Sequence, residues 1–257
     1  MERTWGIANT QPDSCPRQAK VAGRGHDPES RVELLPTQTV QATVSRRCRS
    51  YLILKRVTDL LIAGVALLIL WPLLVVIGLL VKLDSAGPAL FLQTRIGKAG
   101  RPFRVIKFRT MRHNVDNAAH KAFMRAFVRG KICPSQASNA LYKPFDQSEV
   151  TRIGRILRRT SFDELPQLLN VLKGEMSLVG PRPNVPWEVT EYKEWHMERL
   201  AVLPGITGLA QVNGRSSIIF DTIVQYDIAY VRNQDPWLDV EILWRTFATV
   251  REPHGVM

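Results

Sequence analysis

The sequence predicts a mostly helical α+β chain that is attached to a membrane near its N-terminus. Three observations lead to this fold class: an uncharged apolar run, two short strand patterns joined by a glycine-containing turn, and several segments with helical periodicity. The chain has 257 residues, enough for one sizeable domain with attachments or for two small domains. Because apolar residues make up 45% of it, wholesale disorder is excluded.

Charge and cysteine content restrict the chemistry further. A formal net charge of +12 points to anionic partners, namely nucleic acid, phosphorylated metabolites or an acidic membrane surface. Cys15, Cys48 and Cys133 are odd in number and widely spaced, which excludes a disulfide framework and a CxxC zinc site and fits a reducing compartment.

The N-terminal third begins with a polar stretch and continues into the apolar run. Residues 1–50 are interrupted by proline and glycine and lack the apolar core of a signal peptide, so we expect a mobile tail. Residues 60–81 contain no charge, and their length is enough for a membrane helix. Pro72 near the middle predicts a bend, and basic residues flank both ends. Either a re-entrant helix or a kinked spanning helix fits this pattern.

Beyond the apolar run, the elements follow in order. Residues 89–97 and 103–111 predict two strands of a hairpin with its turn at 97–100, and residues 117–129 predict an amphipathic helix. His113 and His120 show no metal-ligand spacing and are expected at the surface. Residues 237–250 predict a helix with tryptophans, either in a membrane interface or buried at the end of the chain.

Two amphipathic helices are predicted between residues 151 and 174. In the first, four arginines share about a third of the circumference: Arg152, Arg155, Arg158 and Arg159. The second carries Asp163 and Glu164 outside its apolar arc. Ser161 and Glu164 match a capping box, so both carboxylates could simply stabilise a helix start. The alternative is a phosphate site, because Lys107, Arg109, Arg158 and Arg182 are basic neighbours in adjoining segments and arginine binds phosphate bidentately.

Several long motifs decide between these two interpretations. The run LRRTSFDELPQLLNVLKGEMSLVGPRP resembles the signature of bacterial sugar transferases, the monotopic phosphoglycosyl transferases that start polysaccharide and glycoconjugate assembly on a polyprenyl phosphate. The segments KRVTDLLIA, QTRIG, KFRTM and PGITGLAQVNGR are similar to that family in the same order. The resemblance covers about residues 53–250, and several long motifs in a fixed order are far more specific than a single glycine loop.

The resemblance implies a two-step phosphoryl transfer. Asp163 matches the nucleophile that attacks the sugar-linked phosphate of a UDP-sugar and releases UMP, and polyprenyl (undecaprenyl) phosphate then takes up the sugar phosphate. Glu164 matches the second carboxylate of the dyad, and Mg²⁺ is implied near Asp163. Arg158 and Arg182 match phosphate-binding positions and Lys107 a weaker one. Arg109 and Arg215 complete the set of candidate substrate-binding residues.

The resemblance also implies a topology and a location. The family uses a re-entrant helix broken near its centre, which here is the membrane break at Pro72. Trp71 stands before this proline, where many relatives have serine. We therefore expect a mobile tail (1–50), a re-entrant membrane helix (51–84), and a cytosolic catalytic domain (85–257) with a small hairpin and interfacial helices, facing the cytoplasm at the inner membrane.

Two other functions remain as alternatives. One is a membrane-tethered basic binding module, and the other is a membrane phosphohydrolase in which water resolves the aspartyl intermediate. The sequence contains no recognised nucleic-acid motif, so nucleic acid is not an expected partner, whereas membrane lipids, the UDP-sugar and the polyprenyl phosphate are. The identity of the sugar and the oligomeric state stay open, and a homo-oligomer is compatible with the sequence.

Overall fold

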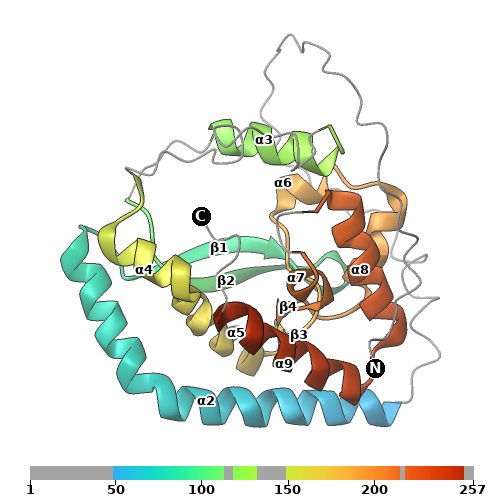
Figure 1. The fold of residues 1–257 in the computed structure, drawn as a ribbon, viewed down its shortest axis with the longest axis horizontal. Coiled ribbons are helices and arrows are strands. Elements are labelled where there is room, and N and C mark those ends of the chain that lie inside the picture. Colours follow the sequence, from blue (N-terminus) through green and yellow to red (C-terminus); the bar gives the residue numbers. More distant parts are fainter. Residues whose placement is uncertain (1–48, 113–117, 132–148, 215–217, 252–257) are drawn as a thin grey trace.

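The computed structural model describes residues 49–112, 118–131, 149–214 and 218–251. Its helices and strands are α2 (Arg49–Asp84), β1 (Leu90–Ile96), β2 (Pro102–Phe108), α3 (Ala118–Val128), α4 (Arg152–Thr160), α5 (Leu168–Lys173), β3 (Ser177–Val179), α6 (Pro186–Val189), β4 (Gly205–Thr207), α7 (Leu209–Val212), α8 (Phe220–Asn233) and α9 (Pro236–Arg251) (Figure 1). Short 3₁₀ helices cover Lys98–Gly100, Phe162–Gln167 and Glu194–Ala201. The predicted mostly helical α+β fold is confirmed, and most of the expected N-terminal tail lies outside the described residues.

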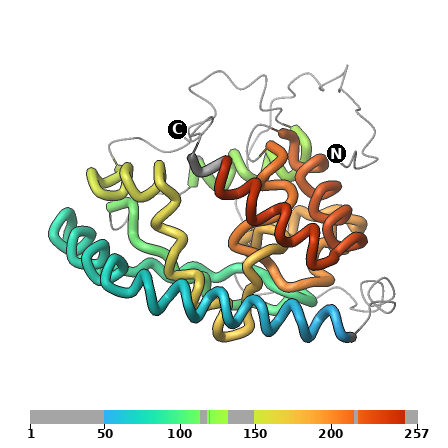
Figure 2. The backbone as a smooth tube through the Cα atoms, turned by 60° about the horizontal axis from the view of Figure 1, so that its bottom comes forward, coloured from blue at the N-terminus to red at the C-terminus, as the bar shows by residue number. Residues whose placement is uncertain are grey.

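Helix α2 consists of two arms that meet at a bend (Figure 1). Its 36 residues contain Pro72, which cannot donate a backbone hydrogen bond, and this accounts for the change of direction. Within the described residues, α2 is the one helix long and apolar enough to cross a membrane. At 1.5 Å per residue it extends over about 54 Å, well beyond the roughly 30 Å of a bilayer's apolar core. Both views show the other elements gathered on one side of α2 (Figures 1 and 2).

Polar contacts hold the first arm of α2 against the rest of the molecule. Arg56 donates hydrogen bonds of 2.7 and 3.1 Å to backbone carbonyls near the end of α5, and Asp59 accepts one of 3.2 Å from the backbone of β3. Lys55 forms an ion pair of 2.7 Å with Asp239 of α9. The Tyr51 hydroxyl also donates a hydrogen bond of 3.2 Å to Asp239, so the contacts begin in the first turn of α2 and its first arm has a fixed position.

The second arm of α2 packs on a different part of the same domain. Ile77 and Val81 are buried against Phe108 of β2 and Leu157 of α4. The carboxylate of Asp84, the last residue of α2, accepts a hydrogen bond of 2.9 Å from a backbone N–H in the first turn of α4. Both ends of the apolar helix are therefore attached to one folded unit.

The predicted hairpin is present with the expected turn. Strands β1 and β2 are antiparallel, with Leu90 opposite Phe108 and Ile96 opposite Pro102. The turn at Lys98–Gly100 includes a left-handed residue, Ala99, at φ 55°. The helix expected at 117–129 is also confirmed, as α3.

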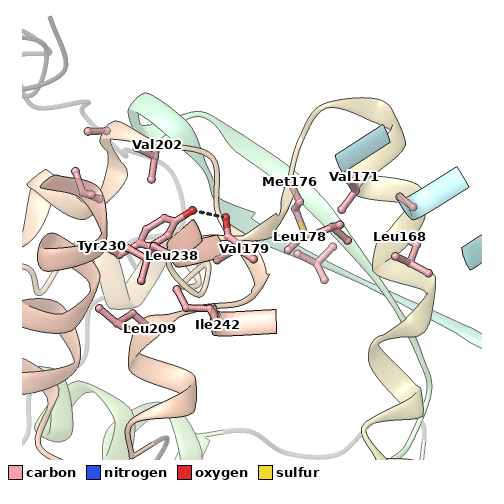
Figure 3. Close-up of a cluster of buried hydrophobic side chains, with 14 residues drawn as sticks. Leu168, Val171, Met176, Leu178, Val179, Val202, Leu209, Tyr230, Leu238 and Ile242 are labelled. Carbon is pink, nitrogen blue, oxygen red and sulfur yellow. Dashed lines mark hydrogen bonds between the residues drawn. The ribbon is translucent and has the colours of Figure 1, made fainter. Parts of the chain in front are cut away.

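The main core surrounds a second pair of strands, β3 and β4, which are parallel. Side chains from α8 and α9 cover them, including Tyr230 and Leu238, and the Tyr230 hydroxyl donates a hydrogen bond of 3.0 Å to the carbonyl of Val179 (Figure 3). The two strands approach so closely that a Cβ at Gly205 would lie 2.1 Å from the backbone nitrogen of Gly180. Glycine is required there.

Helix α9 has one buried face, as expected of a helix packed at the end of the chain, and one exposed face. Leu238 and Ile242 are buried in the core, whereas Trp237, Trp244 and Phe247 are 70, 75 and 67% exposed. An exposed stripe with two indole rings beside the apolar α2 is typical of a helix at a membrane interface.

The structure excludes the capping-box interpretation of Ser161, the alternative that the family motifs disfavour. Ser161 ends α4 in the left-handed conformation, φ 59°, and makes no side-chain cap to the following helix. An N-cap residue needs an extended backbone, so its role as C-cap of α4 excludes the predicted one. The predicted single helix is divided instead into the 3₁₀ helix Phe162–Gln167 and α5.

Candidate active site

Asp163 and Glu164 occupy the first turn of the 3₁₀ helix that follows α4. The left-handed Ser161 reverses the chain there, and the helix packs against β2. Successive residues of a 3₁₀ helix are about 120° apart, so the two carboxylates point in different directions and have different neighbours.

Glu164 is held by two cations from separate segments. Its carboxylate forms ion pairs of 2.7 Å with Lys107 of β2 and 3.3 Å with Arg182, which follows β3. Burial alone would raise the pKa of Glu164, but the charges and hydrogen bonds of Arg182 and Lys107 outweigh it and hold this pKa at about 2. Glu164 is therefore ionised at neutral pH and is a weak base.

Asp163 lies in the opposite electrostatic situation. Burial raises its pKa, the neighbouring charge of Glu164 raises it further, and Lys107, Arg158 and Arg182 only partly counteract this. No residue within the described part of the chain donates a hydrogen bond to its carboxylate. Its oxygens thus remain available to an incoming ligand.

Arg158 adds a further cation from the last turn of α4. Its Nε donates a hydrogen bond of 2.9 Å to the hydroxyl of Thr110, just beyond β2. Burial lowers the pKa of Arg158 while the charge of Asp163 counteracts this lowering, so the two side chains interact electrostatically. The guanidinium stays ionised and interacts with the Asp163 carboxylate.

Glu164, Lys107 and Arg182 line one pocket, together with Arg95 of β1 and Gln167. Arg95 donates to the carbonyl of Pro183 at 3.1 Å and to the side chain of Gln93, and burial lowers its pKa to about 10, so it remains charged. The pocket lining thus carries three cations and one acid, Glu164, whose charge is balanced by Lys107 and Arg182. This excess of positive charge suits a ligand with several phosphate charges.

Sequence reasoning missed Arg95 and Gln167 as members of the pocket. The signal was present, because Arg95 stands near the end of a predicted strand within QTRIG, and Gln167 follows Glu164 by three residues. The sequence alone could not place Arg95 or Gln167 near Arg182, because this requires knowing how segments distant in the chain pack together.

A buried ion pair supports the loop that carries Arg182. Arg199 and Asp227 are each 2% exposed and contact one another directly. Arg199 also donates hydrogen bonds to the carbonyl of Arg182 at 3.1 Å and to the side chains of Asn184 and Tyr192, both at 2.6 Å. The backbone at Arg182 is fixed from behind.

Arg109 does not belong to the pocket, contrary to the expectation from its sequence position. It is 5% exposed and donates hydrogen bonds to the backbone carbonyls of Ser85 and Ala86 at 2.7 and 2.8 Å. Its guanidinium caps the turn at the end of α2, because carbonyls left free at a helix end attract cations. The structure gives it a structural role.

Other candidates from the sequence have mixed outcomes. Arg215, His113 and Cys133 lie outside the described residues. His120 of α3 is half-buried rather than fully exposed, and burial followed by the charges of Arg95 and Arg158 lowers its pKa. No group of three histidine, cysteine, aspartate or glutamate side chains gathers within the residues that the structure describes.

Comparison with known proteins gives consistent matches. A family model for bacterial sugar transferases matches residues 50–252. The chain is 39% identical over 202 residues to the galactosyl transferase CpsE of Streptococcus agalactiae, covering 78% of this chain and 43% of that protein. It is 39% identical over 203 residues to the UDP-glucose:undecaprenyl-phosphate glucose-1-phosphate transferase of Escherichia coli, covering 76% and 39%.

A shorter relative matches over most of its length. The exopolysaccharide production protein ExoY of Rhizobium meliloti is 39% identical over 198 residues, which cover 76% of this chain and 84% of that protein. The chain thus spans about two fifths of the longer relatives and most of the shorter one. Since the family model covers nearly everything from α2 to α9, the chain belongs to the bacterial sugar transferase family of enzymes.

Proposed function

We propose that this chain transfers a sugar-1-phosphate from a UDP-sugar to polyprenyl phosphate with release of UMP. The observation that carries the proposal is the unequal environment of the two carboxylates. Glu164 is occupied by Lys107 and Arg182, whereas Asp163 has a raised pKa and accepts no hydrogen bond within the described residues. The names of relatives, among them the glucose-1-phosphate transferase of Escherichia coli, support the same overall reaction.

In the first step, an Asp163 oxygen attacks the phosphorus bonded to the sugar. The bond from this phosphorus to the bridging oxygen breaks, and UMP leaves with that electron pair. In the second step, a phosphate oxygen of the acceptor attacks the same phosphorus, and the Asp163 carboxylate is regenerated. Net charge is conserved in each step. The surrounding cations position the phosphate groups and neutralise their negative charge, and phosphoryl transfer depends mainly on these two effects.

We assign different tasks to the neighbouring residues. Arg158 offsets the charge that develops as Asp163 approaches the phosphate, since its guanidinium interacts electrostatically with the Asp163 carboxylate. Arg182 and Lys107 bind phosphate oxygens, and Glu164, with its pKa of about 2, orients these two cations rather than acting as a base.

Mg²⁺ fits this donor set. Magnesium is commonly held by one or two carboxylates together with substrate phosphates and water. Asp163, next to the pocket residue Glu164, is the carboxylate of the two that is not engaged in an ion pair, so it would hold the ion with the donor diphosphate. The bound ion would supply Lewis-acid stabilisation of phosphoryl charge.

We further propose that α2 enters and leaves the membrane on the cytoplasmic side. Both of its ends are attached to the same folded unit, and Pro72 lies between them. In a background without native cysteines, Ser50→Cys and Ala86→Cys should be labelled from the same face, and Trp71→Cys should be protected. Labelling of positions 50 and 86 from opposite faces would show a spanning helix.

Asp163→Asn tests the chemistry. This variant should lose UMP release by at least about a thousandfold, because removal of a nucleophile leaves only binding and electrostatic effects. Glu198→Gln, an acid in an exposed ion pair, serves as the control and should retain activity. Intact-mass measurement of quenched wild-type enzyme with donor alone should show a phosphosugar adduct.

The choice of substrates separates the alternatives. UDP-glucose, UDP-galactose and UDP-N-acetylgalactosamine are the first donors to assay, since the names of relatives include these sugars. If sugar phosphate forms at the same rate without polyprenyl phosphate, the chain is a phosphohydrolase. If no donor turns over while anions bind in a salt-sensitive manner, the binding-module alternative is favoured.

A further inference from the structure

Helix α4 carries a cationic face that the active site does not use. Its nine residues include four arginines and no acid. Arg158 alone among them turns to Thr110 and Asp163, whereas Arg152, Arg155 and Arg159 are exposed. These three share one face, because residues three and four positions apart lie together on a helix. We refer to them as the α4 arginine face.

The packing of α4 fixes the direction of this face. A Cβ at Gly154 would lie 2.1 Å from the carbonyl oxygen of Thr110, so the helix backbone contacts the end of β2 directly. Leu157 is 3% exposed and packs on the second arm of α2. With that side buried, rotation of α4 is prevented and the arginine face must point outward.

The surroundings of the face are apolar on one side and basic on the other. Ile156, within α4, is 59% exposed, and Leu83 at the end of α2 is 84% exposed. Figure 1 shows α4 running beside the second arm of α2. The packed pair of α2 and α4 thus exposes both aliphatic side chains and arginines, a combination that suits the boundary between the bilayer interior and the headgroups.

Few charges balance the face locally. Asp84 interacts with Arg152 and also accepts a hydrogen bond from α4, while Glu149 precedes the helix. Lys82 and Arg112 add exposed positive charge nearby. Within the described residues, the guanidinium groups of Arg155 and Arg159 form no hydrogen bond or ion pair. Unpaired exposed guanidinium groups next to exposed aliphatic side chains call for an anionic partner.

We infer that the α4 arginine face binds the phosphates of anionic phospholipids and holds the active site at the membrane surface. This inference rests on the proposed membrane arrangement of α2. Anionic headgroups are favoured over a soluble polyanion because the face is continuous with the apolar surface of α2. Binding there would keep Arg158, which lies at the edge of this face and turns towards Thr110, and Asp163 close to the acceptor phosphate.

The test uses the full chain reconstituted in vesicles, with native cysteines replaced and a fluorophore on Ile156→Cys. Quenching by brominated lipids reports the ratio of lipid-contacting to water-exposed probe. In vesicles containing phosphatidylglycerol, Arg155→Gln with Arg159→Gln should lower this ratio about 25-fold, roughly fivefold for each arginine. Removal of two exposed charges from the hairpin turn, Lys98→Gln with Arg101→Gln, is the matched control and should have little effect.

The outcomes are distinguishable. The effect should vanish in pure phosphatidylcholine and weaken in 1 M salt, while UMP release in detergent stays unchanged. If the chain floats with both kinds of vesicle but the probe responds neither to phosphatidylglycerol nor to the arginine changes, this inference is overturned and membrane attachment through α2 stands. If a soluble polyanion abolishes the lipid contact at physiological salt, the face binds that class of partner instead. Failure to float with any vesicle would refute the proposed membrane arrangement itself.

Discussion

Replacing Asp227 by asparagine removes the charge that balances Arg199 while preserving the shape of the side chain. Both residues are 2% exposed, so water cannot solvate the guanidinium left behind. Removal of one partner from a buried ion pair costs about 3–5 kcal/mol. For a folded unit of this size, each kcal/mol lowers the melting temperature by roughly 2–4 °C, so we expect a decrease of roughly 6–20 °C.

Thermal unfolding of the purified full chain in one detergent measures this effect. Arg232→Gln is the matched control, because Arg232 pairs with Glu198 at 2.7 Å but is 60% exposed, and such a pair contributes less than about 1 kcal/mol. The double variant Asp227→Leu with Arg199→Met removes both buried charges and should be more stable than Asp227→Asn.

The same substitution should also affect the pocket. Arg199 donates a hydrogen bond to the carbonyl of Arg182, so a displaced Arg199 would loosen the loop that carries this proposed phosphate-binding residue. At a temperature where both proteins are folded, Asp227→Asn should raise the KM for the UDP-sugar. If Asp227→Asn lowers the melting temperature no more than Arg232→Gln does, the conclusion that Arg199 and Asp227 form a buried ion pair in which each charge requires the other is refuted.

The remaining predictions concern the pocket itself. Because the pKa of Asp163 is raised and the proposed nucleophile must be ionised, kcat/KM should rise with pH through that pKa. Lys107→Met removes a cation that lowers the pKa of Asp163, so this rise should move to higher pH. An unchanged pH profile would contradict the assignment of Asp163 as nucleophile. The folded pKa of Glu164, about 2, lies below the ordinary 4.5, so its ionisation contributes up to about 3 kcal/mol above pH 4.5, lost as the pH falls towards 2. Glu164→Gln should therefore lower the melting temperature at pH 7 but by less at pH 3, and an equal effect at both would count against the ion pairs. Gly154→Ala should cost about 1–3 kcal/mol through its clash with Thr110, measured by chemical unfolding; wild-type stability would show that α4 can move away.

Local pattern was sufficient to predict the elements that depend on near neighbours. The hairpin follows from two alternating stretches around Gly97 and Gly100, and the apolar run with Pro72 predicts a long, bent helix. The pairing of Glu164 with Lys107 and Arg182 was not readable in this way. It joins residues separated by 57 and 18 positions, and family motifs pointed to them only as separate sites.

The errors have a common physical origin. Arg109 and Arg158 are both arginines beside the pocket segments, yet one caps the end of α2 and the other faces Asp163. At Ser161, a capping-box pattern was overruled by the reversal of the chain after α4. In each case the outcome depends on which distant backbone lies opposite, and periodicity carries no information about that.

The attachment of α2 at both ends connects the membrane to the chemistry. Its first arm holds α5 through Arg56, and α5 continues directly from the 3₁₀ helix that carries Asp163. Its second arm holds α4, which ends three residues before Asp163. Asp163, the proposed nucleophile, therefore lies between two segments that are each attached to one arm of the same apolar helix. A bend that fixes the depth of α2 in the bilayer would also fix the distance of Asp163 from the membrane surface. A substitution that straightens α2 at Pro72 should therefore preserve turnover of the donor in detergent but reduce transfer to an acceptor in the membrane.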